Sequence, residues 1–167
     1  ELVGRECFGG LDMASHEDLS AFVLYFPAGN EDQRSFVLPF IFCPAGKIRE
    51  REAAGMAFYR QWKDEGWLMT AGESRVDHRT IQQAIRECCD LYNVTEVGFD
   101  PWGADGVVNE LIDEGTPMIA VSQGLAGMTP GTRALLDDIS EKRIFHGGNP
   151  VMSWCLSNCT ADQKADG

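Results

Sequence analysis

Short apolar runs separated by polar links make up the N-terminal part of the chain. Residues 7–13, 21–26 and 35–43 each predict a strand, because each is a brief apolar run bounded by polar residues. The links between them, residues 14–20 and 27–34, are short. Consecutive strands joined this tightly favour an antiparallel meander.

The period of the apolar positions then becomes helical. Ile48, Met56 and Trp62 recur at roughly helical spacing, and Gly66 suits the end of a helix. The pattern therefore predicts one continuous helix over residues 47–66.

The rest of the chain alternates between the two kinds of element. It predicts helices over 80–92, 103–114, 132–142 and 151–159, and strands over 94–99 and 118–122. This order favours an α/β fold with a mixed five-stranded sheet, in which a three-strand antiparallel meander precedes alternating strands and helices that cover both faces. A doubly wound fold is the competitor, but such a fold does not begin with three tightly linked strands.

Two aspartates stand where predicted strands end. Asp12 closes the first strand, and Asp100 closes the strand over 94–99 and is followed by a proline. If the two strands are neighbours, the carboxylates meet and can bridge two Mg²⁺ ions about 3.5–4 Å apart, one activating water and one stabilising the leaving 3′ oxygen. The alternative is that each aspartate serves only a turn or a helix cap.

Other polar residues are candidates for outer contacts to the metal, its water or a phosphate: Asp18, Asp77, His146 and Asn158. Each has a plainer interpretation. Asp18 suits a solvated turn, Asp77 suits a helix N-cap, and His146 and Asn158 suit ordinary surface or hydrogen-bonded positions.

The net charge of −12 argues against a broad basic surface for nucleic acid. Carboxylates that bind metal add negative charge themselves, so a nuclease is not excluded. Affinity for DNA would then come from a local basic patch, from bound metal or from another part of the protein. No apolar run approaches the ~20 residues needed to span a bilayer, so no membrane partner is expected.

The cysteine and tryptophan side chains are interpreted as structural residues. The six cysteines form no CxxC pair, which favours buried thiols over a disulfide or zinc site. The four tryptophans are predicted to be mostly core or partly buried residues and not stacking platforms for bases.

The chain resembles the nuclease domain of tailed-phage terminase large subunits. Four segments carry the resemblance, in order over nearly the whole chain: GGLDMASHEDLSAFVLYFP, FYRQWKDEGWLMTAG followed by Asp77 and Ile81, VGFDPWGADGVVNEL, and IFHGGNPVMSWCLSN. The resemblance implies a ribonuclease H-like fold and a metal-dependent endonuclease that cuts double-stranded phage DNA during genome packaging. Asp12 matches the first-strand metal ligand of the family, and Asp100 matches the ligand on the later strand.

The resemblance also implies a setting for the domain. It implies two Mg²⁺ or Mn²⁺ ions as cofactors, and double-stranded DNA, a portal protein and the small terminase subunit as partners, in the host cell cytoplasm. Residues 1–167 would be a single nuclease domain that lacks a preceding ATPase domain and a C-terminal segment with the third metal-binding acid. Two alternatives stay open: a non-catalytic ribonuclease H-like module that binds DNA or motor partners, and a doubly wound enzyme that binds a nucleotide or small molecule near Asp100.

Overall fold

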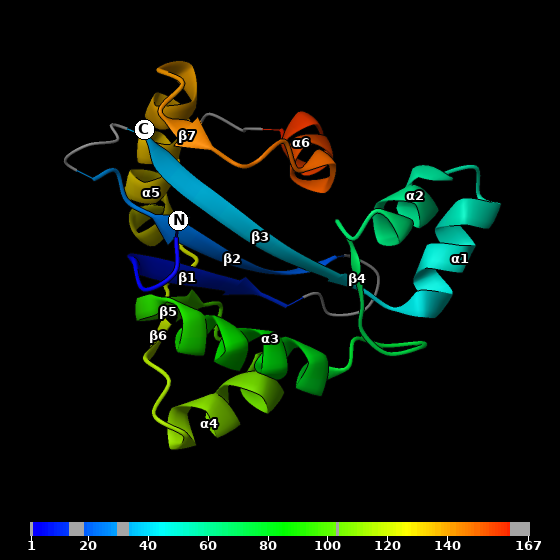
Figure 1. The fold of residues 1–167 in the computed structure, drawn as a ribbon, viewed down its shortest axis with the longest axis horizontal. Helices are drawn as coiled ribbons and strands as arrows, with labels where there is room; N and C mark the ends of the chain where they lie inside the picture. Colours follow the sequence, from blue (N-terminus) through cyan, green and yellow to red (C-terminus); the bar gives the residue numbers. More distant parts are fainter. Residues whose placement is uncertain (1, 14–18, 30–33, 103, 161–167) are drawn as a thin grey trace.

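The computed structural model describes residues 2–13, 19–29, 34–102 and 104–160. A mixed sheet forms the centre of this part of the chain, with strand order β4-β3-β2-β1-β5-β6 and with β7 pairing β3 (Figure 1). The strands are β1 (Glu6–Asp12), β2 (Ser20–Phe26), β3 (Ser35–Cys43), β4 (Met69–Thr70), β5 (Asn93–Phe99), β6 (Met118–Ala120) and β7 (Ile144–Phe145).

The predicted meander is present. β1, β2 and β3 pair antiparallel in succession, while β5 runs parallel to β1 and β6 runs parallel to β5. The five expected strands all belong to the sheet, and the short strands β4 and β7 extend it by pairing parallel with opposite ends of β3. The antiparallel pairs exclude the doubly wound alternative.

The helices of the described residues are α1 (Ala45–Ala53), α2 (Phe58–Asp64), α3 (His78–Leu91), α4 (Asp105–Asp113), α5 (Leu125–Ser140) and α6 (Pro150–Ser157). The prediction of one helix over residues 47–66 was wrong, because the chain breaks between α1 and α2. Gly55 lies there with φ +90°, a conformation that glycine adopts without steric cost. The described helices include none with the length and apolar character needed to cross a membrane.

Two apolar clusters hold helices on opposite faces of the sheet. On one face, α3 and α4 cover β1, β2 and β5 through Leu11, Phe22, Leu24, Val97, Ile81, Ile85, Val107 and Leu111. On the other face, β3 packs with α1, α2 and α6 through Ile41, Cys43, Ile48, Tyr59, Trp62 and Val151. Side chains alternate along a strand, so neighbouring residues of one strand serve the two clusters in turn.

The cysteines are free thiols, as the absence of a CxxC pair predicted. Cys7, Cys43 and Cys88 are buried, whereas Cys159 is exposed, contrary to the expectation of burial. Burial raises the pKa of Cys7 and of Cys43 to about 11 and that of Cys88 to about 12.

These thiols predict a loss of stability in alkali. Above the ordinary thiol pKa of 9.0, the unfolded chain releases protons that the folded chain retains, so the free energy of unfolding falls as pH rises towards 11 or 12. Urea unfolding with a reductant across this range measures the effect. Cys88→Ala should make the dependence on pH shallower, and Cys159→Ala should leave it unchanged. Equal slopes for the two variants would contradict the assignment.

Trp62 is the second test of the core. It is 6% exposed and packs against Phe58, Tyr59 and Trp154 with ring centroids 4.7, 5.3 and 5.7 Å away. Trp62→Ala should lower the free energy of unfolding by about 3–5 kcal/mol, because it removes a buried aromatic side chain. The matched control is Trp102→Ala at an 86% exposed position, with an expected change under about 1 kcal/mol. A similar loss in both variants would show that Trp62 is not part of a packed core.

Candidate functional site

Asp12 and Asp100 lie at the carboxyl ends of adjacent parallel strands. In the pairing of β1 with β5, Gly10 is the partner of Gly98 and Leu11 is the partner of Phe99. Asp12 and Asp100 are the next residues in this register. The prediction that the two acids belong to neighbouring strands is therefore confirmed.

The acids stand apart from the main core. Leu11 is buried in the cluster under α3 and α4, and Phe99 packs against that cluster. Because side chains alternate, Asp12 follows Leu11 on the opposite face of the sheet. Asp12 is exposed and Asp100 is half-buried, so both carboxylates are within reach of solvent.

A bare stretch of sheet lies beside Asp12. Gly10 belongs to the same face as Asp12, and a Cβ atom built on it would meet nothing within 4 Å. Gly9, on the core face, is different: its Cβ would come within 2.9 Å of the side chains of Phe22 and Val97. One glycine is thus needed for core packing, and the other leaves open space next to the acid.

A tight turn holds Asp100. The backbone N–H of Trp102 donates a hydrogen bond of 2.9 Å to Oδ1 of Asp100, and Pro101 restricts φ between them. No side chain of the described residues contacts the Asp100 carboxylate or that of Asp12 through a hydrogen bond or ion pair. Oδ1 of Asp100 is thus held by the turn, and Oδ2 has no hydrogen-bond partner among the described residues.

The donor set suits a hard divalent cation. Mg²⁺ binds through one or two carboxylates together with water and substrate phosphate, and Asp12 and Asp100 supply carboxylates of this kind. Among the residues that the structure describes, no group of three or more His, Cys, Asp or Glu side chains is placed to hold a metal ion. The described chain therefore offers two acids and not a complete protein cage.

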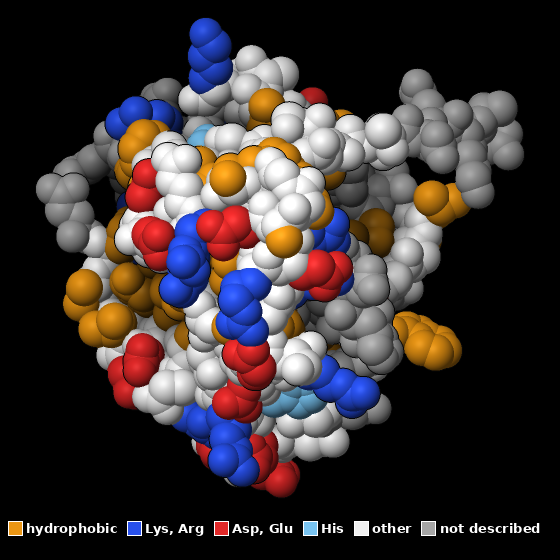
Figure 2. Space-filling view, turned by 90° about the vertical axis from the view of Figure 1, so that its right-hand side faces the viewer, with side chains coloured by type: hydrophobic (Ala, Val, Ile, Leu, Met, Phe, Trp, Pro, Cys, Tyr) orange, Lys and Arg blue, Asp and Glu red, His pale blue; other side chains and the backbone are white. Residues whose placement is uncertain are grey.

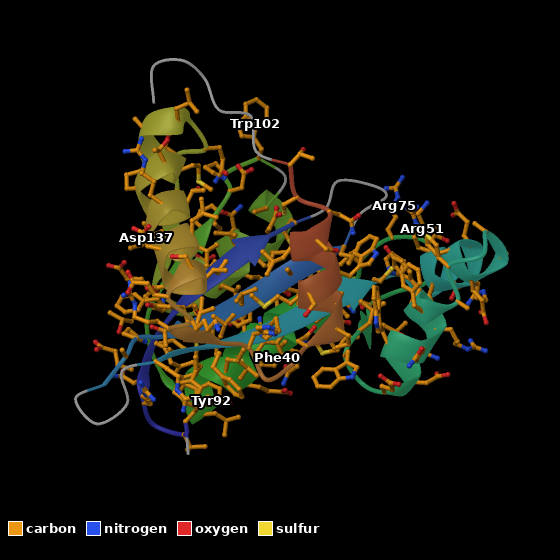
Figure 3. All side chains as sticks on the ribbon, turned by 90° about the horizontal axis from the view of Figure 1, so that it is seen from above. Phe40, Arg51, Arg75, Tyr92, Trp102 and Asp137 are labelled. Atoms are coloured by element: carbon orange, nitrogen blue, oxygen red, sulfur yellow. The ribbon has the colours of Figure 1, made fainter. Side chains whose placement is uncertain are left out.

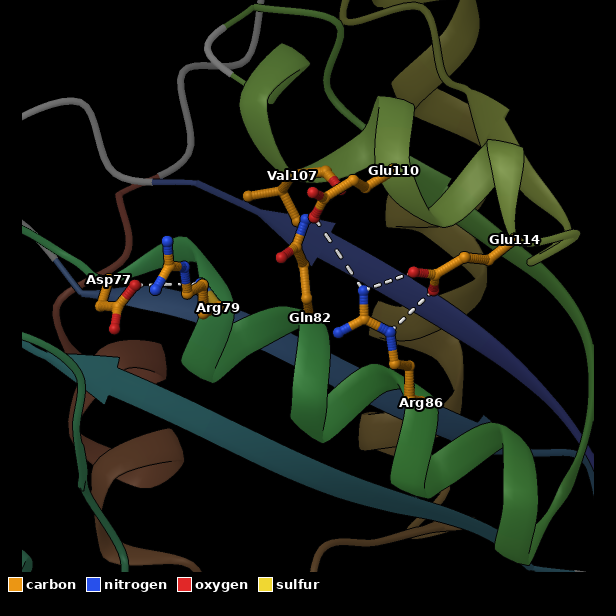
Figure 4. A network of polar contacts seen from close by, with 7 residues as sticks. All are labelled: Asp77, Arg79, Gln82, Arg86, Val107, Glu110 and Glu114. Atoms are coloured by element: carbon orange, nitrogen blue, oxygen red, sulfur yellow. Dashed lines mark hydrogen bonds and ion pairs between the residues drawn. The ribbon is translucent and has the colours of Figure 1, made fainter.

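Contacts between α3 and α4 fix the segment that follows Asp100 (Figure 4). Arg86 of α3 donates two hydrogen bonds, of 2.7 and 2.8 Å, to the carboxylate of Glu114 next to α4. Gln82, which is buried, donates to the backbone oxygen of Val107 at 3.1 Å. The hydrogen bonds from Arg86 lower the pKa of Glu114 and raise that of Arg86, so the pair stays charged. These contacts hold α4 against α3.

Two of the outer candidates cap helices. Asp77 precedes α3 and accepts a hydrogen bond of 3.1 Å from the backbone N–H of Arg79, as a helix N-cap does. Asn158 ends α6 and donates to the backbone oxygen of Trp154 at 2.7 Å. Both side chains are explained by local structure, and no described contact joins either of them to Asp12 or Asp100.

The structure does not bring His146 to the acids. His146 follows β7, which pairs with Ser35 and Phe36 at the start of β3. The carboxyl ends of β1 and β5 lie at the other end of the sheet. The prediction that His146 contacts the metal, its water or a phosphate beside Asp12 and Asp100 is therefore wrong. His146 lines a cavity of about 420 Å³ along the edge of β3 instead. Asp18 lies outside the described residues.

The prediction that the tryptophans are core or partly buried framework residues was wrong at Trp102. Trp62 is buried and Trp154 is half-buried, Trp67 is partly buried at 37% exposed, but Trp102 is 86% exposed. Figure 3 shows Trp102 standing clear of the sheet. No local pattern in the sequence marks Gly9 and Gly10 beside Asp12, or Arg75 and Arg79 near Asp77, as neighbours of the site.

Comparisons with known proteins agree with this architecture. The crystal structure of the HK97 bacteriophage large terminase superposes with a TM-score of 0.82 at 28% identity, over 95% of this chain and 33% of that one. The large terminase subunit of Enterobacteria phage HK97 is 30% identical over 98% of this chain and 32% of its own length. Protein YmfN of Escherichia coli (strain K12) is 24% identical over 93% of this chain and 35% of its own.

The fold is that of the ribonuclease H-like nucleases, a mixed sheet with helices on both faces. Residues 1–167 match the family described as "Terminase large subunit, endonuclease domain" from end to end, and the chain belongs to this family. It spans about a third of the length of the curated relatives that it matches.

The two glycines of β1 provide a test of the site's geometry. Gly9→Ala should lower the free energy of unfolding by about 1–3 kcal/mol, because the new methyl group would overpack Phe22 and Val97. Gly10→Ala should change it by under about 1 kcal/mol, since its Cβ meets open space. Thermal or urea unfolding measures both, and the opposite ranking would show that the two faces of β1 are misassigned.

Proposed function

We propose that this domain is a divalent-metal-dependent endonuclease that cuts double-stranded DNA during phage genome packaging. The observation that supports it most directly is the pairing of β1 with β5, which places Asp12 and Asp100 at the carboxyl ends of neighbouring strands. Membership of the terminase endonuclease family supports nuclease activity in general. The metal dependence and the roles of the two acids are the proposal.

Asp12 and Asp100 would hold Mg²⁺ or Mn²⁺. When bound, such ions activate water and stabilise the leaving oxygen of a phosphodiester. The protein itself would orient the carboxylates and leave space for the substrate. The turn to Trp102 fixes the Asp100 carboxylate, and the open face at Gly10 leaves space for a backbone phosphate beside Asp12. Without a cation, two carboxylates side by side would repel that phosphate.

The partners follow from the proposed role. The HK97 relative is a terminase large subunit, and we infer that the protein carrying this domain acts on viral DNA together with a portal protein and a small terminase subunit. The expected place of action is the cytoplasm of the host cell.

The test of this proposal is cleavage of plasmid DNA by the complete protein. The wild type should nick plasmid with Mn²⁺ or Mg²⁺ and stop when a chelator is added. Asp12→Asn and Asp100→Asn should each abolish cutting, because neutral amides are poor ligands for hard cations. Asp100→Asn keeps the oxygen that accepts from Trp102, so its effect would not come from loss of the turn.

Asp137→Asn, at an exposed position of α5, is the matched control and should cut like the wild type. Cutting by the Asp12→Asn, Asp100→Asn double variant would overturn the assignment of the metal ligands. If the wild type binds DNA but does not cut under any metal condition, the domain is the non-catalytic alternative.

A further inference from the structure

The side chain of Trp102 is exposed, although a hydrogen bond fixes its backbone. Its backbone N–H donates to Asp100, so the indole begins two residues from a proposed metal ligand and shares its turn. Its side chain is 86% exposed. Burial of apolar surface is favourable, and an exposed indole on a fixed turn leaves that gain to a partner.

A second fixed segment, residues 71–77, follows β4. It is closed by hydrogen bonds from the backbone N–H of Asp77 to the oxygen of Ala71, at 3.3 Å, and from Ala45 to Gly72, at 3.0 Å. Gly72 has φ +76°, and a Cβ there would come within 2.2 Å of the backbone oxygen of Arg75. The segment is therefore a tight turn that presents Arg75 at a defined position.

The two segments are neighbours. A Cβ on Gly106, at the start of α4, would lie 2.9 Å from Nδ1 of His78 at the start of α3. The start of α4, which follows the turn at Asp100, thus lies against the start of α3, which carries Arg79 and follows the segment with Arg75. Figure 3 shows Trp102 and Arg75 along the same edge of the sheet.

Arg75 and Arg79 are exposed, and within the described part of the chain neither side chain forms an ion pair. Several other arginines do have acidic partners: Arg49 pairs with Glu73, Arg60 with Asp64, Arg86 with Glu114, and Arg143 with Asp138. Figure 2 looks onto this end of the molecule and shows cationic and anionic side chains interspersed over it. An anion at this end of the molecule would therefore meet individual arginines and not a uniform basic surface.

We propose that the DNA duplex crosses the carboxyl edge of the sheet over the acids, with Arg75 and Arg79 after β4 on backbone phosphates and Trp102 after β5 against the sugars. This inference rests on the proposed function, because it concerns the same substrate. Contacts of this kind position a duplex without reading its sequence.

The spacing fits a duplex. β4 is three strands from β1 in the sheet, about 14 Å at the usual strand separation. A DNA strand carries one phosphate per about 3.4 Å of helix axis, so a strand that crosses the sheet from β4 to β1 would place about four phosphates over this width.

The salt dependence of DNA binding tests the arginines. With a chelator present to prevent cutting, the affinity of the complete protein for a short duplex is measured between about 50 and 200 mM salt. Arg75→Ala and Arg79→Ala should each reduce the slope of log affinity against log salt by about 0.9, the value for one phosphate contact. Arg75→Lys, which keeps the charge, should retain the slope. Arg133→Ala on α5, also at an exposed position, should leave it unchanged.

Trp102 has a different signature. Trp102→Ala should weaken binding at every salt concentration without changing the slope, because no charge is lost, and Trp102→Phe should restore part of the affinity. Phe145→Ala is the control, since Phe145 is 48% exposed but lies in β7, which pairs with the start of β3 at the other end of the sheet.

The outcomes separate this inference from the proposed function. The proposed course of the DNA would be wrong if the Arg75, Arg79 and Arg133 variants gave equal slopes of log affinity against log salt. The comparison requires unchanged unfolding midpoints. Asp12→Asn should lose cutting but retain the slope of the wild type. If Asp12→Asn still cuts while the arginine variants lose slope, the metal assignment fails and the DNA path stands.

Discussion

The parallel pairing of β1 with β5 is the constraint on which the site depends. It joins two segments that are far apart in the sequence, and its register makes Leu11 the partner of Phe99. On one face this register supports the core under α3 and α4. On the other face the same register brings Asp12 and Asp100 to neighbouring strand ends. The packing of the first face therefore sets the positions of the two acids on which the proposed metal site rests.

The sequence was most informative where apolar runs are short and clearly bounded. The strands over residues 7–13, 21–26 and 35–43 were found because turns and polar links flank them. The helix break at Gly55 was missed for a physical reason. Ile48, Tyr59 and Trp62 all face the same cluster, so the apolar period continues across the break. An isolated glycine costs only about 1 kcal/mol inside a helix, which makes it a weak signal of an end.

The site was predicted in part. Asp12 and Asp100 could be found because each ends an apolar strand, a local feature. The position of His146 depends on β7 pairing with the start of β3, a contact between distant segments that no local pattern reveals. The exposure of Trp102 was missed because hydrophobicity predicts burial for an isolated tryptophan. Its turn with Asp100 holds the indole outside the core, and only the coordinates of that turn show it.

The net charge of −12 need not oppose binding of DNA, because charge acts over a limited distance. At physiological salt the screening length is about 8 Å, so a phosphate responds mainly to the side chains nearest to it. The acids of α4 and α5, Asp113 and Asp137 among them, belong to helices that follow β5 and β6. Arg75 and Arg79 belong to the segment after β4, on the other side of the acids. Glu73 of that segment pairs with Arg49, and Asp77 caps α3, so Arg75 and Arg79 would be the cationic groups nearest to a phosphate placed there.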